Sequence, residues 1–116
     1  MLFEYHESSL KSGVYQIRNL INGKVYIGSA KEFKERGRSH LRSLQNQKHH
    51  NKHLQAAFNK DGTNNFIFEV LEVVKGNKLV RTKKEQKYLS RYFDNWEGCY
   101  NFQKNTIAID KVNDLS

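Results

Sequence analysis

The chain has 116 residues, of which 37% are hydrophobic, and this is enough for one domain but not for two. No apolar run approaches the roughly 20 residues that cross a membrane, and residues 1–10 lack the basic and apolar regions of a signal peptide. These features predict a soluble globular protein without a membrane partner. Because Cys99 is the only cysteine, no internal disulfide can form, and we expect a reducing compartment such as the cytoplasm.

The net charge of +8 is concentrated in one stretch. Residues 31–60 hold eight basic and two acidic side chains, together with four of the five histidines. Basic surfaces attract phosphate backbones through counterion release. We therefore expect a polyanionic partner, and the alternative is a basic surface that only confers solubility.

Residues 13–29 predict a β-hairpin. Two runs rich in Val, Ile and Tyr flank Asn22-Gly23, a pair that tolerates the positive φ of hairpin turns. Side chains alternate along a strand, so Tyr15 shares a face with Ile17. Whether Tyr26 lies on the same face as Tyr15 depends on the register, which the pattern leaves open.

A helix is expected directly after the hairpin. Ser29 and Glu32 have the spacing of a capping box, which places the start of the helix there. Apolar residues recur at helical spacing from residue 33 to residue 44 and predict an inward face. Arg36 lies at the edge of this face, one turn before His40, so both side chains can act on one spot.

Three further elements follow. A short helix is expected from about residue 51 to residue 60, and residues 66–74 are so apolar that they predict a central strand buried on both faces. Residues 79–93 predict a third helix, whose inward stripe contains Glu85. Burying a carboxylate is costly unless a cation, a metal or hydrogen-bond donors compensate it. Glu85 is therefore either a structural partner of Arg36 or Arg81, or part of a functional site.

Five motifs occur in an order that resembles the GIY-YIG endonuclease superfamily, nearest to the nuclease domains of phage group I intron homing endonucleases. They are Gly13-Val14-Tyr15, Tyr26-Ile27-Gly28, Arg36, Glu85 and Tyr100-Asn101. The resemblance covers residues 11–102 and leaves residues 1–10 as an N-terminal extension and residues 103–116 as a tail or truncated linker. It implies an α/β fold of the α+β type, with a small mixed three-stranded sheet flanked by helices in the order ββααβα.

The resemblance also implies metal-dependent hydrolysis of DNA phosphodiesters, with Mg²⁺ or Mn²⁺ and no organic cofactor. Glu85 matches the metal-binding acid, His49 matches a second site histidine less closely, and Asn101 matches a late asparagine outside the catalytic set. The positions matched to catalysis are Tyr15, Tyr26, Arg36, His40 and Glu85. The candidates for DNA contact near the hairpin are Lys24, Lys31, Lys34, Arg38, Arg42, His49 and Lys52, and each of these cations can instead be an ordinary solvated charge.

Phosphodiester cleavage needs a nucleophilic water, neutralisation of the phosphate charge and stabilisation of the leaving oxygen. Arg36 offers donors that stay charged, and one carboxylate suffices for Mg²⁺, which keeps several of its waters. The residue that acts as the general base is less clearly defined by the sequence. Tyr15, with an ordinary pKa of about 10, needs positive charge from Arg36, Lys24 or the metal, whereas His40 ordinarily titrates at about 6.5. We expect Tyr15 to be the base or to orient the water, and His40 to be a second donor or a relay.

The function predicted by these features is a metal-dependent DNA endonuclease that is a monomer in solution. The alternatives are a non-catalytic nucleic-acid-binding module of the same fold, and a restriction or repair nuclease. A lone acid facing the phosphate would weaken a pure binder, which favours the enzyme. Intron-encoded relatives continue into a DNA-targeting part, so we expect an excised catalytic domain or a free-standing nuclease, in the cytoplasm of a phage-infected bacterium or a similar compartment.

Overall fold

The computed structural model describes residues 1–5 and 11–101, and the predicted C-terminal tail lies outside the described residues. The strands are β1 (Leu2–Glu4), β2 (Gly13–Asn19), β3 (Val25–Ala30) and β4 (Phe66–Val73). The α-helices are α1 (Phe33–Gln45), α2 (Lys52–Asp61) and α3 (Lys78–Leu89). Short 3-10 turns lie at Thr63–Asn65, Ser90–Tyr92 and Trp96–Gly98. Within the described ranges no helix combines the length and apolar character needed to cross a membrane.

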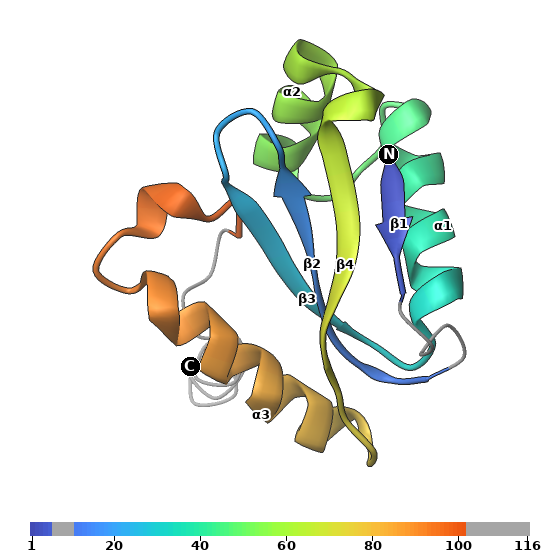
Figure 1. Cartoon of the computed structure of the whole chain (residues 1–116), viewed down its shortest axis with the longest axis vertical. Helices are drawn as coiled ribbons and strands as arrows, with labels where there is room; N and C mark the ends of the chain where they lie inside the picture. Colours follow the sequence, from blue (N-terminus) through green and yellow to red (C-terminus); the bar gives the residue numbers. More distant parts are fainter. Residues whose placement is uncertain (6–10, 102–116) are drawn as a thin grey trace, which may run out of the picture.

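The strands form one sheet in the order β1-β4-β2-β3, with β3 and β1 at its two edges (Figure 1). β2 is antiparallel to both β3 and β4, and β1 is parallel to β4. The predicted α+β class is confirmed, and the helices and strands from residue 13 onward follow the predicted order. The prediction of three strands missed β1, which alone makes the sheet mixed.

The strand buried on both faces is β2 and not, as predicted, the strand at residues 66–74. β2 is buried at five of its seven positions, whereas only Phe66 and Phe68 are buried in β4. β4 is an inner strand because β1 covers the edge that β2 leaves open. The apolar residues in the second half of β4 are therefore only partly covered.

Each face of the sheet carries its own apolar cluster. Tyr15, Ile17 and Phe68 face α1 and α2, and Val14, Val25 and Ile27 face α3 and the segment after it. The two clusters are completed by Phe33, Leu44, Leu54 and Phe58 on the first face and by Leu89 and Cys99 on the second. Burial of each large apolar side chain contributes about 1.5–3 kcal/mol, so the sheet is held between two helical layers.

The hairpin register answers the question that the sequence left open. Tyr15 is paired with Gly28, and Ile17 is paired with Tyr26. Directly paired residues of antiparallel strands have their side chains on the same face, so both tyrosines face α1. The predicted turn is also present, and Gly23 adopts a φ of 77° there.

The predicted capping box is wrong. Ser29 and Ala30 belong to β3, where they pair with Val14 and Gly13. α1 begins at Phe33, and its N-cap residue Glu32 makes no side-chain capping hydrogen bond. The predicted inward face of this helix is confirmed by the burial of Phe33, Gly37, His40 and Leu44.

The outer edge of β3 is closed by the segment that follows the last helical turns. The Tyr100 N–H donates to the Val25 carbonyl at 2.7 Å. The Asn101 side chain accepts from the Ile27 N–H at 2.9 Å and donates to the Ile27 carbonyl at 2.8 Å. Asn101 thus takes the place of a neighbouring strand and fixes the backbone between Tyr26 and Gly28.

We predict that Asn101→Ala lowers the free energy of unfolding by about 1–3 kcal/mol for each Ile27 group that loses its partner, because both groups are buried. The control is Asn59→Ala, which removes an exposed amide bonded to Gln47 and Gln55 and should change stability by less than about 0.5 kcal/mol. Urea unfolding measures both values. Equal effects of the two variants would contradict the structural role of Asn101.

Candidate active site

The site begins with a close approach between Tyr15 and Gly28. A Cβ atom at position 28 would lie 2.6 Å from Cζ of Tyr15, so the tyrosine ring occupies the space that any larger residue would need. Gly13 is needed for the same reason, since a Cβ there would clash with the Glu72 carbonyl and lie 2.9 Å from Cζ of Phe33. The glycine at position 28 therefore leaves room for the Tyr15 ring, and the glycine at position 13 lets β2 approach Glu72 and Phe33 closely.

Both tyrosines make hydrogen bonds to histidines. The Tyr15 hydroxyl lies 2.5 Å from Nε2 of His40, and Nδ1 of His40 lies 2.7 Å from Nε2 of His49. The Tyr26 hydroxyl lies 3.0 Å from Nε2 of His50. The rings of His49 and His50 are stacked, with centroids 4.5 Å apart. His40 is therefore a partner of Tyr15.

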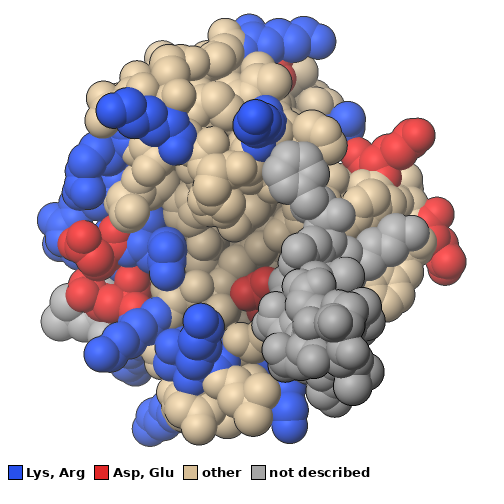
Figure 2. Space-filling view, turned by 180° about the vertical axis from the view of Figure 1, so that it is seen from behind, with Lys and Arg blue, Asp and Glu red and all other residues tan. Residues whose placement is uncertain are grey.

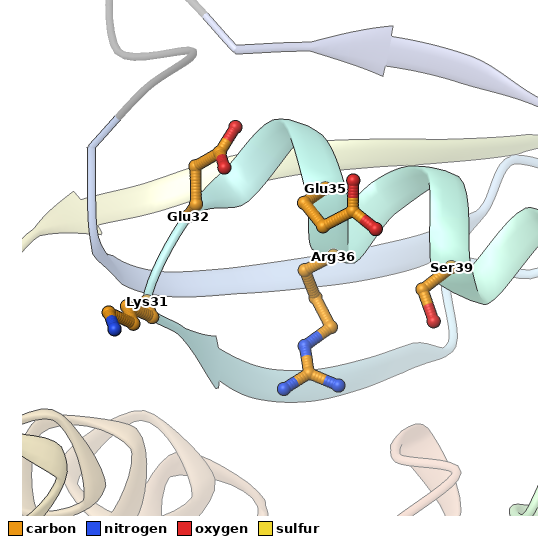
Figure 3. Close-up of a pocket in the computed structure, with 5 residues that line it drawn as sticks. All are labelled: Lys31, Glu32, Glu35, Arg36 and Ser39. Atoms are coloured by element: carbon orange, nitrogen blue, oxygen red, sulfur yellow. The ribbon is translucent and has the colours of Figure 1, made fainter.

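Arg36 supplies the positive charge of the site. Its side chain leaves α1 in the direction away from Glu32 and Glu35, and it lines a hollow of about 670 Å³ (Figure 3). Its charge acts on the pKa of Tyr15, Tyr26 and Glu85. It acts on two histidines as well, His40 and His50. The exposed guanidinium is thus free to meet an anion while its field reaches every candidate catalytic side chain.

Glu85 approaches the same place from α3. Its carboxylate lies near Ser29 at the end of β3, which acts on its pKa. Burial raises the pKa of Glu85, and Ser29 and the Arg36 charge act in the opposite direction. Of the two cations considered from sequence, Arg36 is the one that acts on Glu85, while Arg81 donates to the Gly76 carbonyl at 3.0 Å.

Burial controls the protonation of the site. It raises the pKa of Tyr15 well above its ordinary value and that of Tyr26 to about 12. Burial and neighbouring positive charge lower the pKa of His40 to about 2, and burial and His50 lower that of His49 to about 4. The expectation of an ordinary histidine pKa near 6.5 at His40 is therefore wrong. Arg36 does lower the pKa of Tyr15, as expected, but burial has the larger effect.

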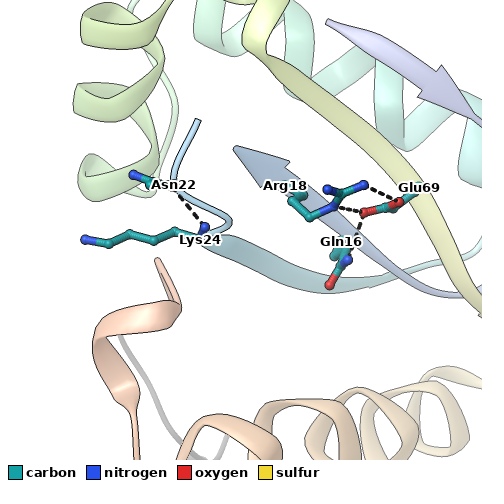
Figure 4. A network of polar contacts seen from close by, with 5 residues as sticks. All are labelled: Gln16, Arg18, Asn22, Lys24 and Glu69. Atoms are coloured by element: carbon teal, nitrogen blue, oxygen red, sulfur yellow. Dashed lines mark hydrogen bonds and ion pairs between the residues drawn. The ribbon is translucent and has the colours of Figure 1, made fainter. Parts of the chain in front are cut away.

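The structure does not bring all the predicted DNA-contact residues to this place. Lys24 lies by the hairpin turn, where Asn22 accepts its backbone N–H at 2.9 Å (Figure 4). It lines a separate hollow of about 560 Å³ with His53 and Trp96. Figure 4 also shows the polar cluster of Gln16, Arg18 and Glu69 on the sheet. Lys24 is not among the charges that shift the pKa of Tyr15.

The other predicted cations form a basic surface. Lys31 shares the hollow with Arg36, and Arg38 forms an exposed ion pair with Glu35 at 3.5 Å. Lys34, Arg42 and Lys52 are exposed, whereas His49 is buried and is hydrogen-bonded to His40. Seen from behind, basic side chains gather on the side of α1 and below it on α3 (Figure 2). The hollow beside Arg36 itself is lined by Glu32 and Glu35 as well as by Lys31, so the basic surface lies around it rather than in it.

Three residues of the site were not found by sequence reasoning. Ser29 was taken for a helix cap, although its place directly after Tyr26-Ile27-Gly28 would allow it to reach a group beyond the strand edge. His50, which is not among the predicted site residues, pairs with Tyr26. Asn51 donates its backbone N–H to Nδ1 of His49 at 3.0 Å, a contact that has no signal in the sequence.

An α+β domain in which two strand tyrosines, an arginine and an acid meet beside a basic helix has the site of a nuclease. The chain belongs to the GIY-YIG family, because the profile of the GIY-YIG catalytic domain matches residues 11–101. The match is to the catalytic domain of this family, and the similar proteins are intron-associated and homing endonucleases.

Named relatives agree with this assignment. Intron-associated endonuclease 1 of Enterobacteria phage T4 is 40% identical over 80 residues, which cover 69% of this chain and 32% of the relative. Probable intron-encoded endonuclease 1 of Neurospora crassa is 36% identical over 98 residues, which cover 80% of this chain and 30% of the relative. The chain thus spans about a third of the length of these relatives.

Solved structures give the same result. The catalytic domain of homing endonuclease I-TevI superposes with a TM-score of 0.71 and 35% identity, covering 80% of this chain and 99% of that domain. A mutant of the same domain superposes with a TM-score of 0.73, and the superposition covers 83% of this chain and 97% of the mutant domain. The fold therefore matches a complete catalytic domain.

The neutral buried histidines predict a pH-dependent stability. The unfolded chain takes up protons on His40 below about pH 6.5, whereas the folded chain does not until about pH 2, so the free energy of unfolding falls as the pH falls from 6.5. We expect the free energy of unfolding of the parent protein, measured relative to that of His40→Asn, to fall by up to about 1.4 kcal/mol for each pH unit below 6.5. Urea unfolding at pH 7, 6 and 5 measures this difference, and a constant difference would contradict a neutral His40.

Proposed function

We propose that this domain hydrolyses DNA phosphodiester bonds in a reaction that depends on a divalent metal, Mg²⁺ or Mn²⁺. The observation that supports the proposal most strongly is the meeting of Glu85 and Arg36 beside Tyr15 and Tyr26 at the edge of β3. An acid and a guanidinium that share one place can hold a cation and an anionic phosphate together. A DNA substrate also suits the basic surface over α1.

Each side chain has a role that its setting allows. Arg36, exposed and permanently charged, binds a non-bridging phosphate oxygen and neutralises charge that develops in the transition state. Tyr15 and Tyr26, as neutral phenols, orient the water and the phosphate through their hydroxyl groups. A phenol acts as a base only when bound charge lowers its pKa, so the resting site holds both tyrosine protons.

The residues fit a hard divalent cation. Mg²⁺ is commonly bound through one or two carboxylates and keeps several waters, so the Glu85 carboxylate is a sufficient protein ligand. Ser29 lies near that carboxylate and favours its charged form. In the described ranges no three His, Cys, Asp or Glu side chains cluster as a metal site, which argues against a fully protein-coordinated structural metal there. A bound cation would supply Lewis-acid activation of water and charge neutralisation.

The rival proposal is a nucleic-acid-binding module without activity. In such a module, the placement of Glu85 by Ser29 beside a phosphate-binding arginine would serve no purpose, because the carboxylate repels the phosphate. The enzyme is the better explanation.

We further propose that the domain acts as a monomer without an organic cofactor in a reducing compartment, consistent with the buried Cys99 thiol. Cleavage mapping on random DNA would distinguish a homing from a restriction or repair specificity.

Supercoiled plasmid tests the proposal directly. We expect nicking by the parent protein with Mg²⁺ or Mn²⁺ and none with a chelator. Glu85→Gln and Arg36→Gln should each lower the rate by about 100-fold or more, since each removes a charge placed at the reacting phosphate. The control is Glu97→Gln, an exposed acid in the second hollow, which should cut at the parent rate.

Far-UV circular dichroism and melting temperatures must show that the variants remain folded. A parent protein that binds DNA but never nicks it with either metal would establish the binding module instead. Full activity in Glu85→Gln would show that the acid is a structural residue.

A further inference from the structure

A chain of hydrogen bonds leads from a backbone amide to Tyr15. The Asn51 N–H lies 3.0 Å from Nδ1 of His49, Nε2 of His49 lies 2.7 Å from Nδ1 of His40, and Nε2 of His40 lies 2.5 Å from the Tyr15 hydroxyl. The imidazole contacts alone do not say which atom donates. The contact between Asn51 and His49 does identify its donor, because a backbone N–H can only donate.

The direction of every later bond follows from that first donor. Nδ1 of His49 accepts the Asn51 N–H, so it carries no proton, and the single proton of neutral His49 lies on Nε2. This N–H donates to Nδ1 of His40, which places the proton of neutral His40 on Nε2. The His40 Nε2–H then donates to the Tyr15 oxygen.

Burial keeps both rings neutral, which the deduction requires. His40 is 4% exposed and His49 is 6% exposed. The charged and titratable groups that face them are Arg36, His50 and Tyr26, and Arg36 opposes a positive charge on His40. Either ring with two protons would also have to break a bond, since a doubly protonated imidazole has no acceptor.

We propose that the Asn51 amide, acting through His49, fixes His40 as a hydrogen-bond donor to Tyr15 and turns the Tyr15 proton away from the histidines. His49 and His40 are thus positioning residues, and the use of Tyr15 in the reaction rests on the proposed nuclease function. Of the two roles expected for His40, the resting structure selects the donor, because a relay would need an unprotonated Nε2.

The tautomers can be measured without DNA or metal. In the full-length protein with ¹⁵N-labelled histidine, long-range ¹H–¹⁵N correlation spectra at pH 7 distinguish the two neutral forms and the imidazolium. We expect the Nε2–H form at both His40 and His49. An Nδ1–H form or an imidazolium at either residue would overturn the proposal. Because this measurement does not depend on cleavage, failure of the nuclease assay would leave its result intact.

A pair of variants tests the role of His49. His49→Gln keeps one acceptor for Asn51 and one donor for His40, whereas His49→Phe keeps neither. We expect His40 to stay in the Nε2–H form in His49→Gln and to lose this fixed form in His49→Phe. In the plasmid assay, kcat should fall about tenfold or more in His49→Phe at unchanged KM, with recovery in His49→Gln. An unchanged His40 tautomer in His49→Phe would show that His49 does not position it.

Discussion

The site depends on the absence of a side chain at Gly28. Tyr15 is paired with this residue across the hairpin, and its ring fills the space where a Cβ would lie. Only in that position does its hydroxyl reach His40 on α1. The same contact joins the hairpin to the first helix, since the Tyr15 ring also stacks on Phe68 of β4 with centroids 4.6 Å apart. The absence of a side chain at Gly28 therefore allows the hairpin, β4 and α1 to pack around the Tyr15 ring.

The second organising feature is the outer edge of β3. Its outward backbone groups at Val25 and Ile27 are met by the neighbouring residues Tyr100 and Asn101, and Ser29, two residues further along β3, lies near Glu85 of α3. The acid that we assign to the metal is therefore placed by the strand that carries the second tyrosine. Because these partners follow β3 by more than fifty residues in sequence, the site is complete only when the last described segment has packed.

Local patterns predicted much of this structure. The hairpin, the inward face of α1 and the placement of Glu85 near Arg36 follow from turn residues, helical spacing and the order of motifs. The missed features depend on distant partners. β1 is three residues long, which gives no periodicity, and its partner is β4. Ser29 fits a capping pattern, but pairing with Val14 extends the strand through it. The low pKa of His40 comes from burial and from the nearby His49, Arg36 and His50, and helical spacing does not reveal the approach of the two other histidines.

The occupied edge of β3 has a further consequence. A strand with unpaired backbone groups invites another chain to extend the sheet, which leads to aggregation or unintended pairing. Here the groups that would accept such a chain are already bonded within the domain. Any protein segment or second molecule must therefore attach to this edge at Val25 and Ile27 through side chains rather than through backbone pairing.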